Sequence, residues 1–148
     1  MKILESITDL NLSSGGAVTS TLNSYGLLRE RGVDIEMVTL LPYSNDDAYL
    51  GNGYDGINAL PFDGVSQFVY SKNLNWFLEQ HKDYDIYHAN GIWTYPTFKT
   101  IRTARKQDKP CVVTIHGMLN RNALRMTSFK KQLFLKLFQK RDLENIKD

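Results

Sequence analysis

The sequence contains few cysteines and histidines and no long apolar segment. Its single cysteine, Cys111, excludes an internal disulfide and fits a reducing compartment. A metalloenzyme is disfavoured, since no two of the His, Cys, Asp and Glu residues have the spacing of metal ligands. No window approaches the roughly 20 apolar residues that a membrane-spanning helix needs, and the apolar run at the N-terminus is too short for a signal peptide. We therefore expect a cytoplasmic protein.

Three common catalytic motifs are also absent. There is no Gly-x-Gly-x-x-Gly dinucleotide fingerprint and no P-loop lysine, which disfavours NAD and ATP as ligands. The Gly-x-Ser-x-Gly nucleophile elbow is missing as well, and its absence removes the commonest serine-hydrolase mechanism.

The composition is that of an ordinary globular protein. The chain has 148 residues, of which 42% are hydrophobic and 23% are charged, and this length suffices for one domain with a complete hydrophobic core. No internal repeat, low-complexity tract or linker divides it. We therefore expect a single domain over residues 1–148.

Charge is distributed unevenly along the chain. Residues 1–98 hold five Lys and Arg against twelve Asp and Glu, a net charge of −7, whereas residues 99–148 hold thirteen against four, a net charge of +9. Two explanations stay open: solvated helix faces of opposite sign, or an anionic partner for the basic half. Nucleic acid is disfavoured as that partner, because the lysines lack interleaved exposed aromatic residues and a known recognition motif.

Short apolar runs alternate with amphipathic segments along the chain. The runs predict strands at Lys2–Ile7, Asp34–Leu41, Ile57–Pro61, Asp85–Asn90 and Cys111–Ile115. The amphipathic segments predict helices at Ala17–Arg31, Val65–His81, Tyr95–Gln107 and Ser128–Ile146. Such alternation implies a mainly parallel sheet with helices on both faces. We expect a doubly wound, Rossmann-like α/β fold with strand order 3-2-1-4-5.

Polar residues follow two of the expected strands. Asn90 and Gly91 come at the end of one strand, and His116 and Gly117 at the end of the next along the chain. Since ligands of open α/β sheets bind at the carboxyl ends of the strands, these residues are candidates for a site. In that position His116 can donate to a ligand oxygen, act as a general acid or base, or be a structural histidine.

Three further features near the strand ends allow two interpretations each. His88 shares a strand face with Ile86, so packing in the core is favoured over a functional role. Trp93 and Tyr95 can stack on a sugar ring or fill the edge of the sheet with aromatic side chains. Gly15-Gly16, at the start of the first expected helix, either forms a plain tight turn or presents backbone N–H groups to a phosphate.

Several of these segments together resemble a known family. They are Gly15-Gly16-Ala17 with the helix that follows and Gly32, DIYHANGIW at 85–93, KPCVVTIHGMLNRNAL at 109–124, and the Lys-rich final helix. The combination, which covers nearly the whole chain, resembles the N-terminal domain of family-4 glycosyltransferases. Those enzymes have the two-domain GT-B architecture and transfer sugars with retention of configuration.

The resemblance implies an enzyme that transfers a sugar from a nucleotide-sugar donor to a glycan or lipid-linked acceptor, without a metal ion or another cofactor. It also implies that this chain is the N-terminal, acceptor-side domain, and that the domain with the nucleotide site and a pair of glutamates lies outside it. The 148-residue chain alone is then expected to be inactive. The competing interpretation is a non-catalytic module that binds a sugar or a nucleotide.

Matching positions supply the candidate site residues that the resemblance implies. Gly15 and Gly16 match the loop near the donor phosphates, and His116, the catalytic candidate, matches the histidine that reaches the transferred sugar, with Gly117 beside it. The acceptor-side candidates are the other residues expected at the same edge: Asn90, Gly91, Trp93, Met118, Asn120 and Arg121.

The last expected helix suggests a further partner. Its basic residues are Lys130, Lys131, Lys136, Lys140 and Arg141, and its apolar side carries Phe129, Phe134 and Phe138. A basic amphipathic helix suits an anionic membrane surface, which would place the protein at the inner face of the membrane. Alternatively, the phenylalanines pack on the sheet and only the charges face solvent.

Overall fold

The computed structural model describes residues 1–41, 50–61, 63 and 69–119. It contains one five-stranded parallel sheet in the order β3-β2-β1-β4-β5. The strands are β1 Lys2–Ser6, β2 Asp34–Leu41, β3 Ile57–Pro61, β4 Ile86–Asn90 and β5 Cys111–Thr114. The helices are α1 Gly16–Glu30, α2 Lys72–Gln80 and α3 Tyr95–Lys106, with short 3-10 turns η1 Leu12–Ser14 and η2 Leu50–Gly53. The predicted α/β Rossmann-like class and strand order are confirmed.

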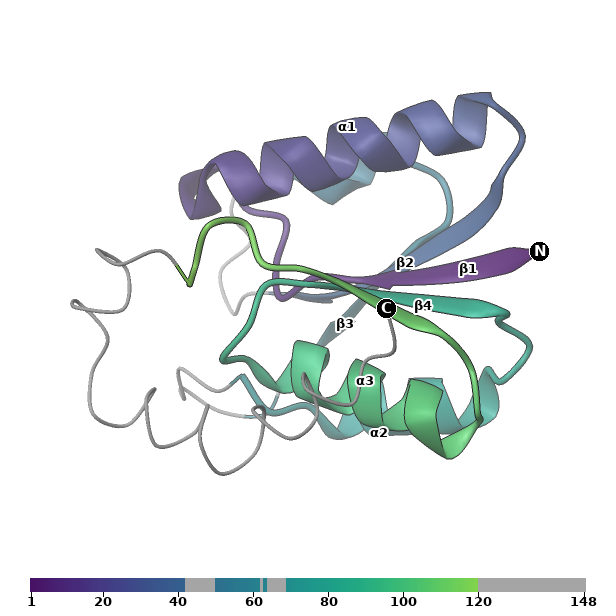
Figure 1. Cartoon of the computed structure of the whole chain (residues 1–148). Helices are drawn as coiled ribbons and strands as arrows, with labels where there is room; N and C mark the ends of the chain where they lie inside the picture. Colours follow the sequence, from purple (N-terminus) through teal and green to yellow (C-terminus); the bar gives the residue numbers. More distant parts are fainter. Residues whose placement is uncertain (42–49, 62, 64–68, 120–148) are drawn as a thin grey trace.

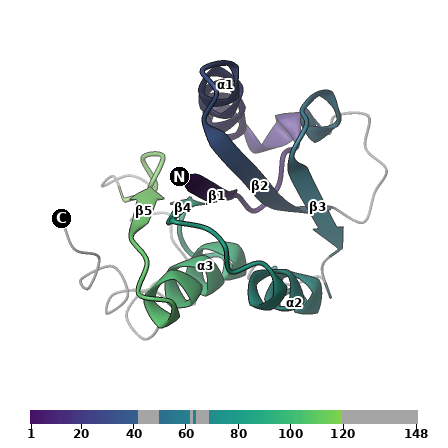
Figure 2. The same ribbon diagram turned by 90° about the vertical axis from the view of Figure 1, so that its right-hand side faces the viewer.

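The helices form layers on both faces of the sheet. Helix α1 lies on one face, and α2 and α3 lie on the other (Figures 1 and 2). Each layer has its own apolar core: Val18, Leu22 and Tyr25 of α1 pack on Ile35 and Met37 of β2. The core on the opposite face comprises chiefly Leu4, Val38, Leu40, Leu74, Phe77, Leu78, Tyr84, Tyr87, Tyr95 and Ala104. Burial on both faces explains why apolar residues point to both sides of the central strands β1 and β2.

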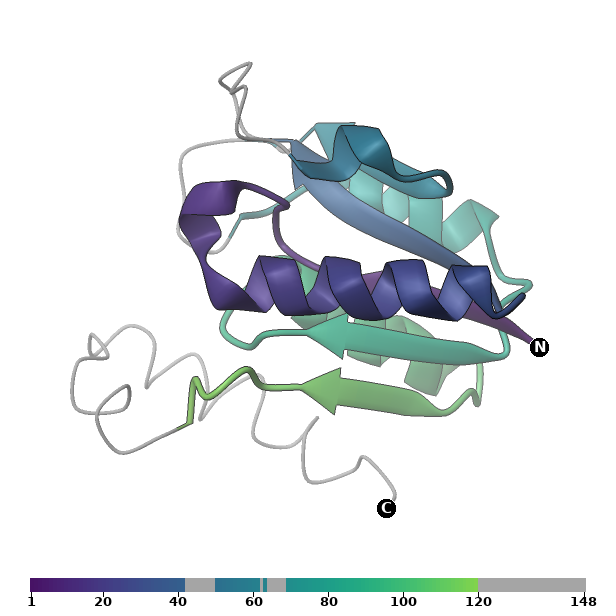
Figure 3. The ribbon, with the colours of Figure 1, turned by 90° about the horizontal axis from the view of Figure 1, so that it is seen from above.

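Helix α1 covers only part of its face of the sheet. Seen from above, β4 and β5 lie beside α1 rather than beneath it (Figure 3). Val112 of β5 is accordingly 53% exposed. Polar side chains of β4 and β5 on this face can therefore remain close to solvent.

The second helix is shorter than the predicted Val65–His81. Ser71 ends the extended segment before it, because its hydroxyl accepts the backbone N–H of Leu74 (3.1 Å) as an N-cap and donates to the carbonyl of Pro61 (2.8 Å). Val69 has a φ of 55°, which is incompatible with the helix that the apolar pattern predicted. The predicted helix at 128–146 and its basic residues lie outside the described residues.

The amino ends of the strands carry a network of ion pairs. The Lys2 ammonium lies 2.8 Å from Asp83 Oδ2 and 3.0 Å from Glu36 Oε1, and Tyr84 donates to Glu36 Oε2 at 2.6 Å. Hydrogen bonds to Asp83 and Glu36 raise the pKa of Lys2 to about 12. These contacts join the starts of β1 and β2 to the turn before β4.

Candidate functional site

The ends of β4 and β5 meet at the carboxyl edge of the sheet. His116, after β5, has its Nε2 atom 2.8 Å from Oδ1 of Asn90, the last residue of β4. The backbone N–H of Gly91 donates to the carbonyl of Thr114 at 2.8 Å, which holds the two strand ends together. Two candidates from the sequence, separated by 26 residues, are thus in direct contact.

The turns that follow these strands adopt left-handed backbone conformations. After β4, Gly91 has a φ of 85° and Trp93 a φ of 66°. After β5, His116 has a φ of 47° and Gly117 a φ of 73°. Glycine adopts such angles freely, whereas Trp and His do so at a cost, and costs of this kind cluster at functional sites. Both turns therefore support a site at this edge.

Asn90 is held inside the protein by hydrogen bonds. Its side-chain Nδ2 donates to Oε1 of Glu5 in β1 at 2.8 Å, and the Thr21 hydroxyl of α1 donates to its Oδ1 at 3.3 Å. Only 3% of Asn90 is exposed. Both ends of the amide thus bond to protein groups, and the structure buries Asn90 rather than placing it at the surface, as an acceptor contact would require.

His88 joins the same polar cluster. Its Nδ1 lies 3.1 Å from Glu5 Oε1, and its Nε2 lies 2.7 Å from the Thr114 hydroxyl. Its side chain is 26% exposed. The prediction that His88 packs in the apolar core is wrong, because a buried carboxylate on the neighbouring strand provides a polar partner that strand periodicity alone does not reveal.

Glu5 is the residue that the sequence interpretation missed. It lies opposite His88 in the β1–β4 register and is 2% exposed. Its Oε2 atom has no hydrogen-bond partner among the described residues. The available signal was an acidic residue directly after Leu4 in the middle of a predicted strand, because a carboxylate in a strand buried on both faces requires polar partners nearby.

His116 favours the neutral form. Burial lowers the pKa of His116 below its usual value, the nearby His88 lowers it further, and Glu5 opposes the shift. Its Nδ1 atom makes no hydrogen bond to any residue in the described part of the chain. A neutral imidazole with one ring nitrogen in use inside the protein leaves the other for a ligand.

Gly15 and Gly16 form the start of α1 at the same end of the sheet (Figures 1 and 3). Gly15 occupies the N-cap position with φ 82° and ψ −157°, and no side chain caps the helix. A Cβ atom added to either glycine would meet nothing within 4 Å. Gly15 and Gly16 are exposed, but the N–H of Val18 already donates to the Gly15 carbonyl at 3.1 Å. The N–H groups that could meet an anion are therefore those of Gly16 and Ala17.

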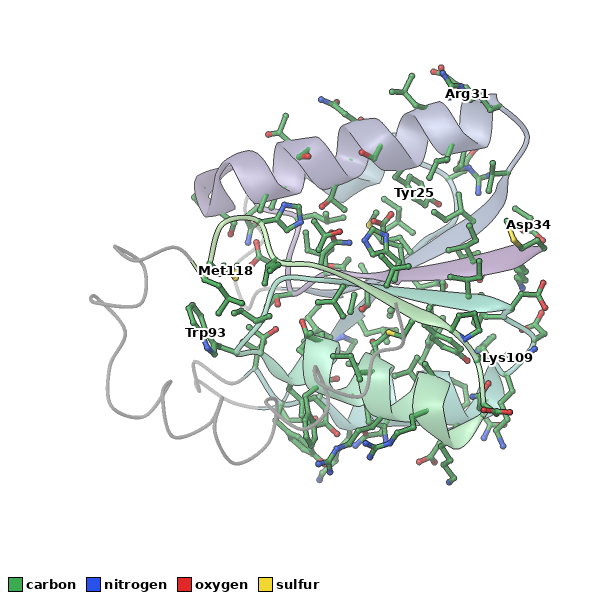
Figure 4. All side chains as sticks on the ribbon, viewed as in Figure 1. Tyr25, Arg31, Asp34, Trp93, Lys109 and Met118 are labelled. Carbon is green, nitrogen blue, oxygen red and sulfur yellow. The ribbon has the colours of Figure 1, made fainter. Side chains whose placement is uncertain are left out.

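Met118 and Trp93 lie near these strand ends, far from Asp34 and Lys109 at the opposite edge (Figure 4). The Met118 sulfur accepts the backbone N–H of Ile92 at 3.4 Å, so the two turns also touch each other. Tyr95, the first residue of α3, is 7% exposed and belongs to the apolar core between the sheet and the helices α2 and α3. Its ring therefore fills the edge of the sheet and is not placed to stack on a sugar. Asn120 and Arg121 lie outside the described residues.

The described residues contain neither a metal-binding cluster nor a membrane-spanning helix. Within 1–41, 50–61, 63 and 69–119, no group of three or more His, Cys, Asp or Glu side chains is arranged to hold a metal ion. None of the described helices has the length and apolar character needed to cross a membrane. The Cys111 thiol lies at the start of β5, away from the site, and burial raises its pKa to about 12.

A five-stranded parallel sheet with helices on both faces defines a Rossmann-like α/β domain. The model of glycosyltransferase family 4 matches residues 14–143 of the chain. The chain therefore belongs to glycosyltransferase family 4, and the resemblance seen in the sequence is confirmed. No curated protein matches it.

Solved structures give a weaker likeness. Crystal structures of S. aureus homoserine dehydrogenase at pH 7.0 and at pH 6.5 share 17% and 16% sequence identity with this chain, at TM-scores of 0.40 and 0.41. The alignments cover 96% of this chain but only 31% and 30% of the dehydrogenase chains. The chain thus spans about a third of their length, and TM-scores this low support no argument about fold or activity.

Proposed function

We propose that this chain is the acceptor-side domain of a retaining glycosyltransferase, which transfers a sugar from a nucleotide-sugar donor to a glycan or lipid-linked acceptor. The observation that carries the proposal is the contact between Asn90 and His116 at the carboxyl edge of the sheet of a family-4 domain. A second domain outside this chain supplies the nucleotide site. The reaction requires no metal ion or other cofactor, and it takes place in the cytoplasm or at the inner face of the membrane.

The two sides of the edge have different roles in this proposal. Negative charge develops on the leaving phosphate as the glycosidic bond breaks, and the backbone N–H groups of Gly16 and Ala17, at the uncapped start of α1, stabilise it. His116 orients the transferred sugar through its free ring nitrogen, with Gly117 beside it. Gly91, Trp93 and Met118, together with Asn120 and Arg121, contact the acceptor.

The test is a turnover assay with a panel of nucleotide sugars. The full-length protein is expected to release nucleotide only when an acceptor is present, and to form a product with the anomeric configuration of the donor. The 148-residue chain alone is expected to show no turnover. Binding of sugars by the full-length protein without any turnover would favour the non-catalytic module, and an inverted product would contradict the retaining mechanism.

A further inference from the structure

We infer that Glu5 acts as a positioning residue that sets the protonation pattern of both histidines at the carboxyl edge. It holds His116 with the proton on Nε2 and His88 with a proton on Nδ1. The inference rests on the proposed function only in its consequence for the ligand. The tautomers themselves follow from the polar contacts of one carboxylate oxygen, Glu5 Oε1, with Asn90 and His88.

The first step concerns the orientation of the Asn90 amide. Glu5 Oε1 is an acceptor, and it lies 2.8 Å from one end of that amide. The end facing Glu5 must be the NH2 group, because two acceptor oxygens at this distance would repel each other. The other end of the Asn90 amide is then its carbonyl oxygen.

The second step carries this constraint to His116. The Asn90 carbonyl oxygen accepts hydrogen bonds and cannot donate, and it lies 2.8 Å from His116 Nε2. Nε2 must therefore carry a proton. In the neutral form, which the lowered pKa favours, Nδ1 is then unprotonated and offers a lone pair.

The third step applies the same oxygen to His88. Its Nδ1 lies 3.1 Å from Glu5 Oε1, at the distance of an ion pair, and a lone pair on Nδ1 would repel that oxygen, so Nδ1 carries a proton. A neutral His88 then accepts the Thr114 hydroxyl at Nε2 over 2.7 Å. Free histidine in water favours the opposite tautomer, with the proton on Nε2. The proton on Nδ1 of His88 therefore depends on the Glu5 carboxylate, and this tautomer tests the role of Glu5 more directly than the tautomer of His116 does.

The consequence concerns the ligand group that meets His116. A lone pair on Nδ1 accepts a hydrogen bond from a hydroxyl group and repels the oxygens of an ionised phosphate. Glu5 thus selects a hydroxyl-bearing ligand at this position, although it lies beneath Asn90 and does not itself reach the ligand. For the proposed transferase, that ligand group is a sugar hydroxyl.

The experiment is a ¹H–¹⁵N spectrum of the histidine ring nitrogens in the full-length protein, at a pH about two units above the ordinary histidine pKa of about 6.5. His88→Gln and His116→Gln variants assign the signals. The wild-type protein is expected to show a proton on Nδ1 of His88 and on Nε2 of His116. An unprotonated Nδ1 on His88 or an unprotonated Nε2 on His116 overturns the inference without any need for a variant.

Two substitutions of Glu5 sharpen the test. Glu5→Met removes the acceptor, so His88 is expected to move its proton to Nε2, the freed Asn90 amide to rotate, and His116 to show mixed tautomers. Glu5→Gln keeps an oxygen at the same place and is expected to retain both wild-type patterns. The matched control is Glu36→Met, which removes a carboxylate at the other edge of the sheet. Unchanged tautomers in Glu5→Met, or a switch in Glu5→Gln or Glu36→Met, overturn the inference.

The kinetic readout separates this inference from the proposed function. With a nucleotide sugar as substrate, Glu5→Met is expected to lower kcat/KM by about tenfold, the effect of one misdirected hydrogen bond. If the histidines show the expected tautomers but the full-length protein has no transferase activity, the proposed function is refuted and the role of Glu5 stands. Activity together with the wrong tautomers would refute the role of Glu5 alone.

Discussion

The two edges of the sheet place their left-handed residues differently. Near the amino ends of the strands these conformations fall on Gly32, Gly56 and Asp108, residue types that adopt them at little cost. At the carboxyl ends they also fall on Trp93 and His116. Trp93 is a bulky residue in a conformation that costs free energy, and strain of this kind is often found at functional sites.

The same contrast holds for charge. At the amino edge, Lys2, Glu36 and Asp83 pair directly with one another near solvent. At the carboxyl edge, the carboxylate of Glu5 is buried, and it meets His88 and Asn90 rather than a lysine or an arginine. Exposed pairs contribute little to stability, whereas a buried carboxylate is costly unless its partners are fixed. The ion pairs at the amino edge join neighbouring elements near solvent, whereas the contacts of Glu5 at the carboxyl edge fix the orientations of His88 and Asn90.

The largest expected effect at the carboxyl edge is on turnover. In the full-length protein, His116→Ala is expected to lower kcat by about two orders of magnitude, because it removes the polar contact to the sugar that the proposed function assigns to this ring. The circular dichroism spectrum is expected to remain that of the wild type. Unchanged kinetics with an unchanged spectrum would assign His116 to structure and remove the functional side of the comparison.

The largest expected effect at the amino edge is on stability. Gly56 has a φ of 77°, and a Cβ there would lie 2.7 Å from Tyr25 Oη, which is fixed by donating to the carbonyl of Asp55 at 2.7 Å. Gly56→Ala is expected to reduce the free energy of unfolding by about 1–3 kcal/mol in urea denaturation. The control Gly53→Ala, where an added Cβ meets nothing within 4 Å, is expected to change it by less than about 0.5 kcal/mol. Equal effects of the two would show that the Tyr25 contact does not restrict this turn.

The sequence predicted the framework of both edges better than their contacts. Apolar runs located all five strands, with the bounds of β2 and β3 as predicted, because burial on both faces leaves a strong pattern. The order followed from the right-handed crossover rule. The predicted start of α2 was wrong, because the Ser71 hydroxyl caps the helix at that point, although the imperfect apolar pattern extends further toward the N-terminus.

The polar cluster was harder to predict for a physical reason. Asn90 and His116 were recognised because each ends a strand, and strand ends are visible in a sequence. Glu5 and His88 meet only through the register between β1 and β4, which joins segments more than 80 residues apart. Contacts of this kind can be predicted only when the register between the two strands is known, and the sequence alone does not give that register.

A smaller effect is expected from the ion pairs of the amino edge. Lys2→Met removes the contacts to Asp83 and Glu36, and it is expected to reduce the free energy of unfolding by at most about 1 kcal/mol, because one partner is well exposed. The loss is expected to shrink in high salt. Lys82→Met, which removes an exposed lysine without an ion pair among the described residues, is the control. A salt-independent loss would mean that the aliphatic stem of Lys2, not its charge, is responsible.

The smallest expected effect is a difference in how the two edges respond to acid. Folding lowers the pKa of His116 from 6.5, so the unfolded chain binds a proton on this ring at a higher pH than the folded chain does. The stability contributed by the neutral ring is therefore complete above pH 6.5 and is lost as pH falls below that value. At the amino edge, the pKa of Glu36 is lowered from 4.5: burial opposes this shift, but hydrogen bonds from Tyr84 and Lys2 outweigh it. Its contribution is therefore lost only at pH values below 4.5.

The measurement is the free energy of unfolding of wild type and His116→Gln between pH 8 and pH 4. Glutamine can still donate to Asn90 but does not titrate, so the variant is expected to lose less stability than wild type as pH falls from 6.5 to 4.5. Below 4.5 the two proteins are expected to lose stability in parallel, because the amino edge is the same in both. Parallel curves over the whole range would show that folding does not lower the pKa of His116.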